Sequence, residues 1–370
     1  MINAKPLAGL LVLDLSQGIA GPYCARLLGD HGARVLKVEP PGGDWMRELG
    51  PGPGATSASA LYYNLGKESL VLDLKQARDL GRALALAARA DVVIESSRPG
   101  AMAKLGLGFE AVRARNAAVI YLSISGFGRT GPRAGEPLTD TVAQAFSGYM
   151  SINRDRDGIP HKTGTTIIDA VTGLYAFQAV TLALWPGGAR EARHLDVSLM
   201  GSAAAVLGPK VLEAAFLGRA PETINAPAGS YRTSDGWIAV TLVREKQFQA
   251  LVRAIGEPDL ARDPRFADFA ERSRNLAPLQ EIIAARLAER TTEDWVTRFT
   301  AAGVLASRIN GFGDWLADPH VVASGTAPMV EVMAGTSLPV PRNPGQKAQD
   351  RPCPGIGEHT AAVLREFGLD

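Results

Sequence analysis

The stretch LLVLDLSQGIAGPYCARLLGDHGARVLKVE, residues 10–39, decides the fold class of this chain. Its first part, Leu10–Ser16, is a short apolar run typical of a buried strand. A helix is predicted over Pro22–Asp30, because proline suits a first helical turn and Gly32 can end the helix. A second strand is predicted over Ala33–Glu39. Two strands joined by a helix predict a parallel βαβ unit.

The same alternation continues up to residue 125. A helix is predicted over Lys75–Ala90, and apolar runs predict three more strands, over Ser69–Leu74, Asp91–Glu95 and Ala117–Ser125. We therefore expect a large α/β domain built on an open, Rossmann-like parallel sheet.

Helical sequence dominates the middle of the chain. Three long helices rich in small apolar residues are predicted over Thr139–Met150, Ile168–Leu184 and Leu199–Leu217. The second of them is apolar on nearly every side, so we expect it to be buried in the core.

A smaller α+β domain is predicted after the loop at Asn225. It begins with a hairpin whose turn is Thr233–Gly236. Its helices are predicted over Glu245–Ile255, Leu276–Arg290 and Thr292–Ala302. A proline-rich linker, Pro339–Pro354, and a closing helix over His359–Phe367 follow. We expect residues 1–225 and the returning residues 331–370 to form the large domain, and residues 226–330 to form the small one.

The composition excludes several classes of protein. Lys and Arg number 39 against 38 Asp and Glu, so the net charge of +1 gives no reason to expect nucleic acid as a partner. Cys24 and Cys353 lie far apart and the five histidines are scattered, which argues against disulfides and a metal site. We find no signal peptide and no apolar run near 20 residues, and so expect a cytoplasmic protein without a membrane partner.

The loop after the first strand carries the spacing Gly18-x-x-Gly21, with Glu39 about twenty residues beyond it. This pattern resembles a dinucleotide-binding turn, but the first glycine pair of the full fingerprint is missing. A general ligand-binding loop at the carboxyl end of a strand is therefore favoured over nicotinamide binding.

Asp169 is the most informative single residue. It lies in TTIIDAVTGLYAF, residues 165–177, where an ionised carboxylate surrounded by apolar residues must be paired, act as a helix cap or have a function. Two interpretations stay open from these residues alone. The side chain either caps the helix that starts near Ile168 or acts as a nucleophile at its N-terminus.

Four basic residues lie next to predicted strand ends: Lys67, Lys75, Arg98 and Lys104. A solvated surface is the ordinary interpretation of such residues. A ligand that carries phosphate is the alternative.

Several segments, in this order along the chain, resemble those of the family III CoA-transferases, the CaiB/BaiF family. They include VLDLSQGIAGPYCARLLGDHGARVLKVEPPGGD, NLGKESLVLDLK, ADVVIESSRPGAMAKLGLG, SISGFGRTGP, the DAVTG at Asp169, SYRTSDGWIAV and GEHTAAVLREFG. The resemblance covers nearly the whole chain. It implies an interlocked homodimer of two-domain subunits that uses coenzyme A as acyl-CoA and needs no metal.

The resemblance also implies roles for individual residues. Asp169 matches the family's catalytic aspartate, and Gln17 and Asp140 match positions near the thioester. Contacts to coenzyme A are implied for Gln17, Leu72, Asp73, Leu74, Lys75, Ser96, Ser97, Arg98, Lys104 and Thr139. The segment ESSRPG departs from the commoner ENFRPG, which removes an amide and an aromatic ring from the expected nucleotide contacts.

The expected reaction moves CoA from an acyl-CoA donor to a carboxylic acid through an aspartyl anhydride and an aspartyl-CoA thioester. Backbone N–H groups near Gln17 and Gly18 are expected to stabilise the oxyanions. The alternatives are a 2-methylacyl-CoA racemase or epimerase and a non-catalytic CoA-binding protein. In the racemases a histidine would immediately precede Asp140, where this chain has Thr139, and a two-base reaction needs that second base.

Overall fold

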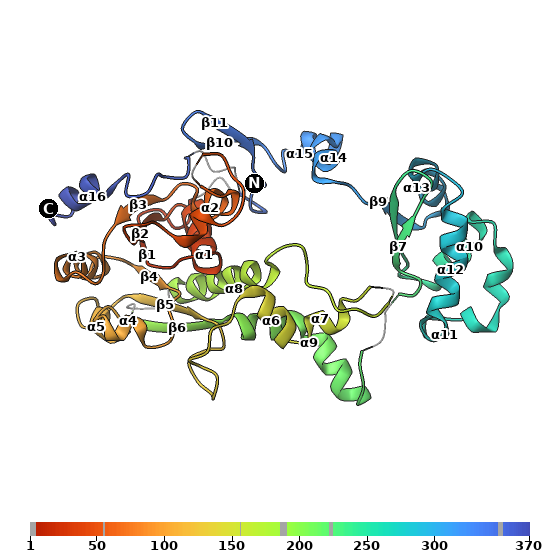
Figure 1. The fold of residues 1–370 in the computed structure, drawn as a ribbon, viewed down its shortest axis with the longest axis horizontal. Helices are drawn as coiled ribbons and strands as arrows, with labels where there is room; N and C mark the ends of the chain where they lie inside the picture. Colours follow the sequence, from red (N-terminus) through yellow and green to blue (C-terminus); the bar gives the residue numbers. More distant parts are fainter. Residues whose placement is uncertain (1–4, 55, 156, 186–190, 222–224, 347–350) are drawn as a thin grey trace. The chain divides into compact units, whose positions relative to one another are not determined.

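The computed structural model describes residues 5–54, 56–155, 157–185, 191–221, 225–346 and 351–370. The chain divides into two units, which we call the large unit and the small unit (Figure 1). The large unit consists of residues 1–212 and 322–370, and the small unit of residues 213–321.

A six-stranded parallel sheet forms the centre of the large unit, with the strand order β3-β2-β1-β4-β5-β6. The strands are β1 (Leu11–Asp14), β2 (Arg34–Glu39), β3 (Glu68–Val71), β4 (Val92–Glu95), β5 (Ile120–Ser125) and β6 (Arg193–Ser198). The predicted α/β class and the five predicted strands are confirmed, whereas β6 was not predicted. The order reverses between β1 and β4, and open sheets of this kind bind ligands at that point.

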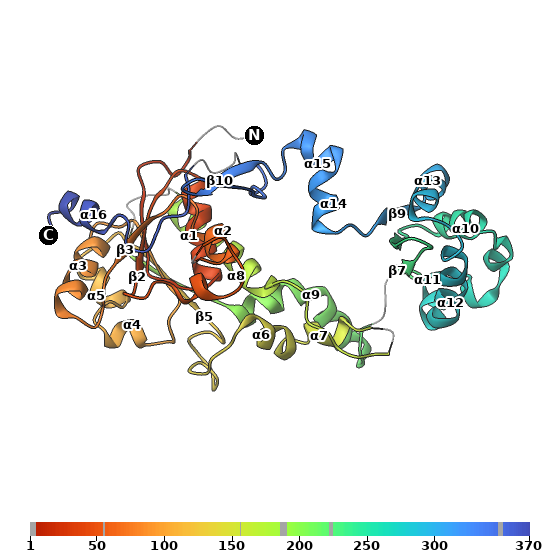
Figure 2. The same cartoon turned by 45° about the horizontal axis from the view of Figure 1, so that its top comes forward.

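Helices cover both faces of this sheet. One face packs against α1 (Ala20–Asp30), α6 (Asp140–Phe146), α8 (Ile167–Leu184) and α9 (Leu199–Leu217). The other packs against α3 (Ala77–Ala87), α4 (Ala101–Lys104), α5 (Phe109–Arg113) and the C-terminal α16 (Thr360–Glu366). Helices α1 and α8 lie side by side, as Figures 1 and 2 both show.

Smaller elements complete the large unit. They are η1 (Trp45–Glu48), α2 (Ala58–Asn64), α7 (Tyr149–Ile152), the hairpin β10 (Met329–Met333) and β11 (Thr336–Pro339), and α15 (Pro319–Ser324) at its boundary. The predicted linker Pro339–Pro354, of which residues 347–350 lie outside the described residues, is fixed to α1: the Tyr23 hydroxyl donates to Asn343 at 3.0 Å.

The small unit combines a three-stranded antiparallel sheet with helices. The strands are β7 (Gly229–Arg232), β8 (Trp237–Thr241) and β9 (Leu305–Arg308), and the hairpin turn lies at residues 233–236, as predicted. The helices are α10 (Glu245–Ala254), η2 (Pro258–Arg262), η3 (Pro264–Phe266), α11 (Phe269–Arg274), α12 (Leu276–Leu287), α13 (Thr292–Ala302) and α14 (Phe312–Ala317).

Three predictions about the long helices were wrong. The helix predicted over Thr139–Met150 is broken into α6 and α7, because Gly148 has a left-handed backbone with φ of +85°. Helix α8 is not buried on every side, since the side chains of Leu174 and Leu182 are exposed. By length and composition, α8 and α9 could each cross a bilayer, contrary to our expectation that no segment could.

Candidate active site

An open cleft of about 460 Å³ lies in the large unit where the strand order reverses. Its walls come from the segments that follow β1, β4 and β5 and from the start of α8. Side chains that the sequence predicted to be functional and that line this cleft are Gln17, Ser96, Ser97, Arg98, Thr139 and Asp169.

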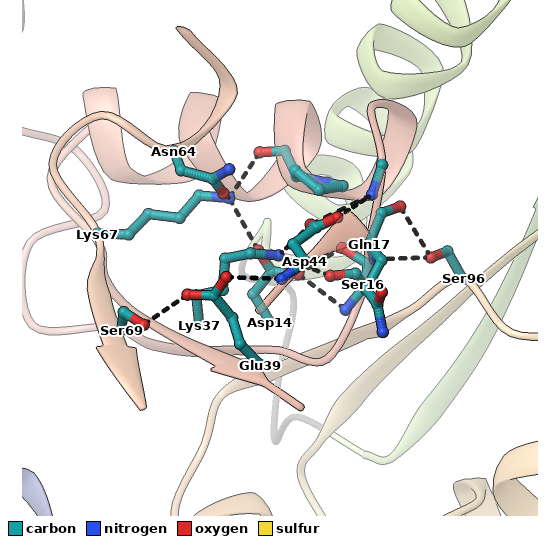
Figure 3. Close-up of polar contacts among 12 residues, drawn as sticks. Asp14, Ser16, Gln17, Lys37, Glu39, Asp44, Asn64, Lys67, Ser69 and Ser96 are labelled. Carbon is teal, nitrogen blue, oxygen red and sulfur yellow. Dashed lines mark hydrogen bonds and ion pairs between the residues drawn. The ribbon is translucent and has the colours of Figure 1, made fainter. Parts of the chain in front are cut away.

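The loop after β1 is held in place by groups beneath it, as Figure 3 shows. The Ser16 carbonyl accepts a hydrogen bond from Lys37 Nζ at 2.7 Å. The Gln17 N–H donates to Ser96 Oγ at 3.0 Å, and the Gly18 N–H donates to the Asp44 carboxylate at 3.1 Å. The backbone N–H groups of Gln17 and Gly18 themselves are therefore already paired.

The groups beneath the loop after β1 include buried charged side chains. Lys37 Nζ lies 2.9 Å from Asp44, and Lys67 Nζ lies 2.8 Å from Asp14, with all four side chains almost completely inaccessible to solvent. Burial alone would raise the pKa of Asp14, but Lys67 and Lys37 hold it below the usual value. Burial would lower the pKa of Lys37, but Asp14 and Asp44 hold it above. At Lys67 burial outweighs these interactions and lowers the pKa to about 8. Removing one member of the cluster would leave the opposite charge buried without compensation.

Lys67 has neither of the roles we considered for it. Its ammonium donates to Asp14 at 2.8 Å, to the Pro22 carbonyl at 2.9 Å and to the Asn64 side chain at 2.9 Å. An ammonium has three N–H bonds, and all three are used. Lys67 is thus neither a surface residue nor a phosphate ligand.

The two glycines of the Gly18-x-x-Gly21 spacing are explained by packing. Gly18 has φ of +82°, and a Cβ there would lie 2.7 Å from the Trp45 ring. A Cβ at Gly21 would lie 2.3 Å from Ser16. The spacing therefore permits a close approach of loop and helix.

Asp169 lies in the first turn of α8 and is one of the residues that line the cleft. Among the described residues, none is recorded as a hydrogen-bond partner of this carboxyl group. Burial, with a smaller effect from the nearby Asp140 charge, raises the pKa of Asp169 to about 7. A carboxyl group with such a pKa is ionised only near and above neutral pH, and its charge is poorly stabilised, which favours attack on an electrophile.

Asp140, not Asp169, caps helix α8. The buried Asp140 carboxylate accepts hydrogen bonds from the backbone N–H groups of Ile168 at 2.7 Å and Asp169 at 3.1 Å. The interpretation of Asp169 as the helix cap was therefore wrong. Asp140 contacts the N-terminus of α8 and is not among the residues that line the cleft.

The remaining predicted residues lie outside the cleft. The segment Leu72–Lys75 follows the end of β3, with Leu72 buried and Lys75 exposed. Lys104 is exposed at the end of α4. Since β3 is two strands away from β1, the spacing of strands places this segment roughly 10 Å from the end of β1.

Two residues near the site were missed by the sequence analysis. Asp44 caps η1 by accepting from the Met46 N–H at 3.0 Å, a local signal that the sequence did offer. The fully buried Gln144 contacts Asp140 and has no such signal. Within the described ranges, no group of three or more His, Cys, Asp or Glu is arranged to hold a metal ion.

Comparison with known proteins places the chain in a family. The model of CoA-transferase family III matches residues 7–360. The chain belongs to the family III CoA-transferases. It is 36% identical to the succinate–glutarate CoA-transferase of Agrobacterium fabrum, over 99% of this chain and 97% of that one.

Other relatives of this family III CoA-transferase agree. It is 34% identical to the acetyl-CoA:oxalate CoA-transferase of Acetobacter aceti, over 98% of this chain and 96% of that one. A crystal structure of a CaiB/BaiF family protein from Brucella suis matches with a TM-score of 0.84 and 31% identity, over 99% of this chain and all of that one. The chain is accordingly an enzyme of the CoA-transferase class.

Proposed function

We propose that this enzyme transfers CoA from an acyl-CoA donor to a carboxylic acid, with Asp169 as the covalent nucleophile. The observation that carries the proposal is Asp169, which lines the cleft, makes no side-chain hydrogen bond to another described residue and has a pKa raised to about 7. An aspartate that only stabilised the fold would be expected to have hydrogen-bond partners and a low pKa.

The reaction divides into four balanced steps. The Asp169 carboxylate attacks the thioester carbonyl, which forms a mixed anhydride and expels the CoA thiolate. The thiolate attacks the aspartyl carbonyl, releasing the donor acid and forming an aspartyl-CoA thioester. The acceptor carboxylate attacks this thioester and expels the thiolate again. The thiolate then attacks the acyl carbonyl of the new anhydride, which yields acyl-CoA and regenerates the Asp169 carboxylate.

Each step develops negative charge on an oxygen. Because the backbone N–H groups of Gln17 and Gly18 are occupied, we assign the oxyanion contact to the Gln17 side chain. Gln17 lines the cleft, and its carboxamide makes no hydrogen bond to another described residue. A well-placed donor of this kind contributes about 3–4 kcal/mol in acyl-transfer enzymes.

We place the rest of the CoA molecule along the carboxyl edge of the sheet. Ser96, Ser97 and Arg98 line the cleft, and Leu72–Lys75 and Lys104 lie beyond it, where the nucleotide of an extended CoA would reach. Thr139 stands where a racemase would need its second base, which supports transfer over racemisation. The small dicarboxylic acids in the names of two relatives make succinate and glutarate the first acids to test.

We also propose that the enzyme is an interlocked homodimer. Leu182 on α8 and Leu212 and Phe216 on α9 are 66%, 73% and 90% exposed in the single chain. We expect a second copy of the chain to cover these side chains. We expect sedimentation to show a dimer with no folded monomer at micromolar concentration. A folded monomer would contradict this proposal.

The function is tested with Asp169→Asn, which keeps the shape of the side chain and removes the nucleophile. Transfer of CoA from succinyl-CoA to glutarate should be lost, while CoA binding should stay within about tenfold because the nucleophile acts mainly in the covalent steps. Hydroxylamine added to wild type after acyl-CoA should convert this one carboxyl group to a hydroxamate, detected by mass spectrometry. Full activity of the variant, or label on another residue only, would refute the assignment.

A further inference from the structure

The buried side chain of Gln144 connects a surface loop to the terminus of helix α8. Gln144 lies on α6, one helical turn after Asp140, and has no exposed surface. Its Nε2 donates to Asp140 Oδ1 at 2.6 Å. Its Oε1 accepts from the backbone N–H of Thr163 at 2.9 Å.

These contacts fix the orientation of the amide. A rotated amide would place its oxygen against the Asp140 carboxylate and its NH₂ group against the Thr163 N–H, so both hydrogen bonds would be lost. The other carboxylate oxygen, Asp140 Oδ2, accepts from the N–H groups of Ile168 and Asp169. A continuous series of hydrogen bonds therefore runs from Thr163 through Gln144 and Asp140 to the backbone of Asp169.

We infer that Gln144 is a positioning residue for the nucleophile, acting through Asp140. This inference rests on the proposed role of Asp169. Gln144 supplies the hydrogen bond recorded for Asp140 Oδ1, so it sets where the carboxylate lies between the helix terminus and α6. The carboxylate in turn sets the position of the Asp169 backbone and contributes to the raised pKa of its side chain.

Gln144→Met tests the inference, because methionine has a similar length and volume but makes neither hydrogen bond. We expect kcat to fall by about 10- to 100-fold, the size of effect that small misplacements of reacting groups produce. The KM for acyl-CoA should change less than about threefold, since Gln144 is not among the residues that line the cleft. Gln249→Met, which changes an exposed glutamine on α10, is the matched control and should behave as wild type.

The pH dependence of Gln144→Glu separates a positioning role of this residue from a role in stability alone. Its carboxyl group can donate to Asp140 Oδ1 only when protonated, so activity should be low at pH 8 and recover in part toward acid. Wild-type activity should instead fall toward acid as Asp169 is protonated. Because Asp169 must still be ionised to attack, activity of the variant should pass through a maximum below pH 8, whereas wild-type activity levels off above pH 8. This comparison decides the question if Gln144→Met fails to fold.

Failure of this inference and failure of the proposed function give different results. A kcat of Gln144→Met within twofold of wild type, or a wild-type pH profile for Gln144→Glu, would overturn the inference. If Asp169→Asn is inactive in the same assay, the proposed function survives that result. If Asp169→Asn is active, the proposed function fails and the inference fails with it.

Discussion

The backbone N–H of Asp169 donates a hydrogen bond to the carboxylate of Asp140, 3.1 Å away, while the two side chains carry charges of the same sign when ionised. Asp140 thus stabilises the helix terminus that presents Asp169 and opposes the ionisation of its carboxyl group. The same residue positions the candidate nucleophile and raises its pKa.

The first prediction concerns the pH dependence of acyl capture. Only the ionised Asp169 can attack a thioester, and its pKa is raised to about 7. The rate of CoA release from acyl-CoA in a single turnover should rise from pH 5.5 to pH 8 and level off above it. A rate that is constant over this range would show that Asp169 is fully ionised throughout, contrary to the prediction.

The second prediction concerns Asp140→Asn. Removing the Asp140 charge removes one of the two causes that raise the pKa of Asp169, so the midpoint of the pH profile should move toward acid, by on the order of one unit. The maximal rate should fall as well, because the new NH₂ group must face a donor, either Gln144 Nε2 or the N–H groups of Ile168 and Asp169. Asp259→Asn, an exposed residue in the small unit, is the control and should leave the midpoint unchanged.

Local sequence patterns were sufficient for the first five strands of the sheet. Strands β1, β4 and β5 are buried and largely apolar, and β2 and β3 carry apolar residues among polar ones, so the pattern predicts each of these elements. Strand β6 was missed because its sequence, RHLDVS, has no apolar run and none of its residues is fully buried.

The site was predictable only in part. Asp169 could be identified because a carboxylate in an apolar run is unusual in any fold. The support of the site depends instead on contacts between distant residues: Asp44 lies 26 positions from Gly18, and Gln144 lies 19 positions from Thr163. No local spacing indicates such pairs. For the same reason, the sequence did not indicate that the folded chain pairs the N–H groups of Gln17 and Gly18.

The third prediction concerns stability and Asp169. The folded-state pKa is about 7 and the ordinary value is 3.8, so between these pH values the folded chain binds more protons than the unfolded chain. The free energy of unfolding therefore falls as pH rises from about 4 to about 7. Asp169→Asn avoids this cost and should be more stable than wild type at pH 8 by about 1–3 kcal/mol.

Urea denaturation at pH 4 and pH 8 would measure this difference, which should nearly vanish at pH 4. Asp259→Asn serves as the control for loss of an exposed carboxylate. Equal stability of wild type and Asp169→Asn at pH 8 would show that burial does not disfavour the charge.

The fourth prediction concerns the buried pair of Lys37 and Asp44. Lys37→Met leaves the Asp44 carboxylate buried without its cation, and breaking such a pair costs about 3–5 kcal/mol of unfolding free energy. The exposed pair of Arg113 and Glu110, at a similar separation of 2.9 Å, is the matched control. Glu110→Gln should cost no more than about 1 kcal/mol, because solvent screens that pair.

The double variant Lys37→Met/Asp44→Leu separates the cost of an unpaired charge from the loss of the pair itself. Replacing both partners by apolar side chains removes the uncompensated carboxylate, so the double variant should be less destabilised than the sum of the two single variants. Its kcat should nevertheless stay low, because Gly18 has lost the carboxylate that accepts its N–H and Ser16 has lost the ammonium that binds its carbonyl. Urea denaturation of Lys37→Met, Asp44→Leu and the double variant tests the predicted stabilities. The kcat of each folded variant tests the predicted effect on activity. Wild-type kcat in the double variant would show that the buried pair stabilises the fold without positioning the loop that carries Gln17.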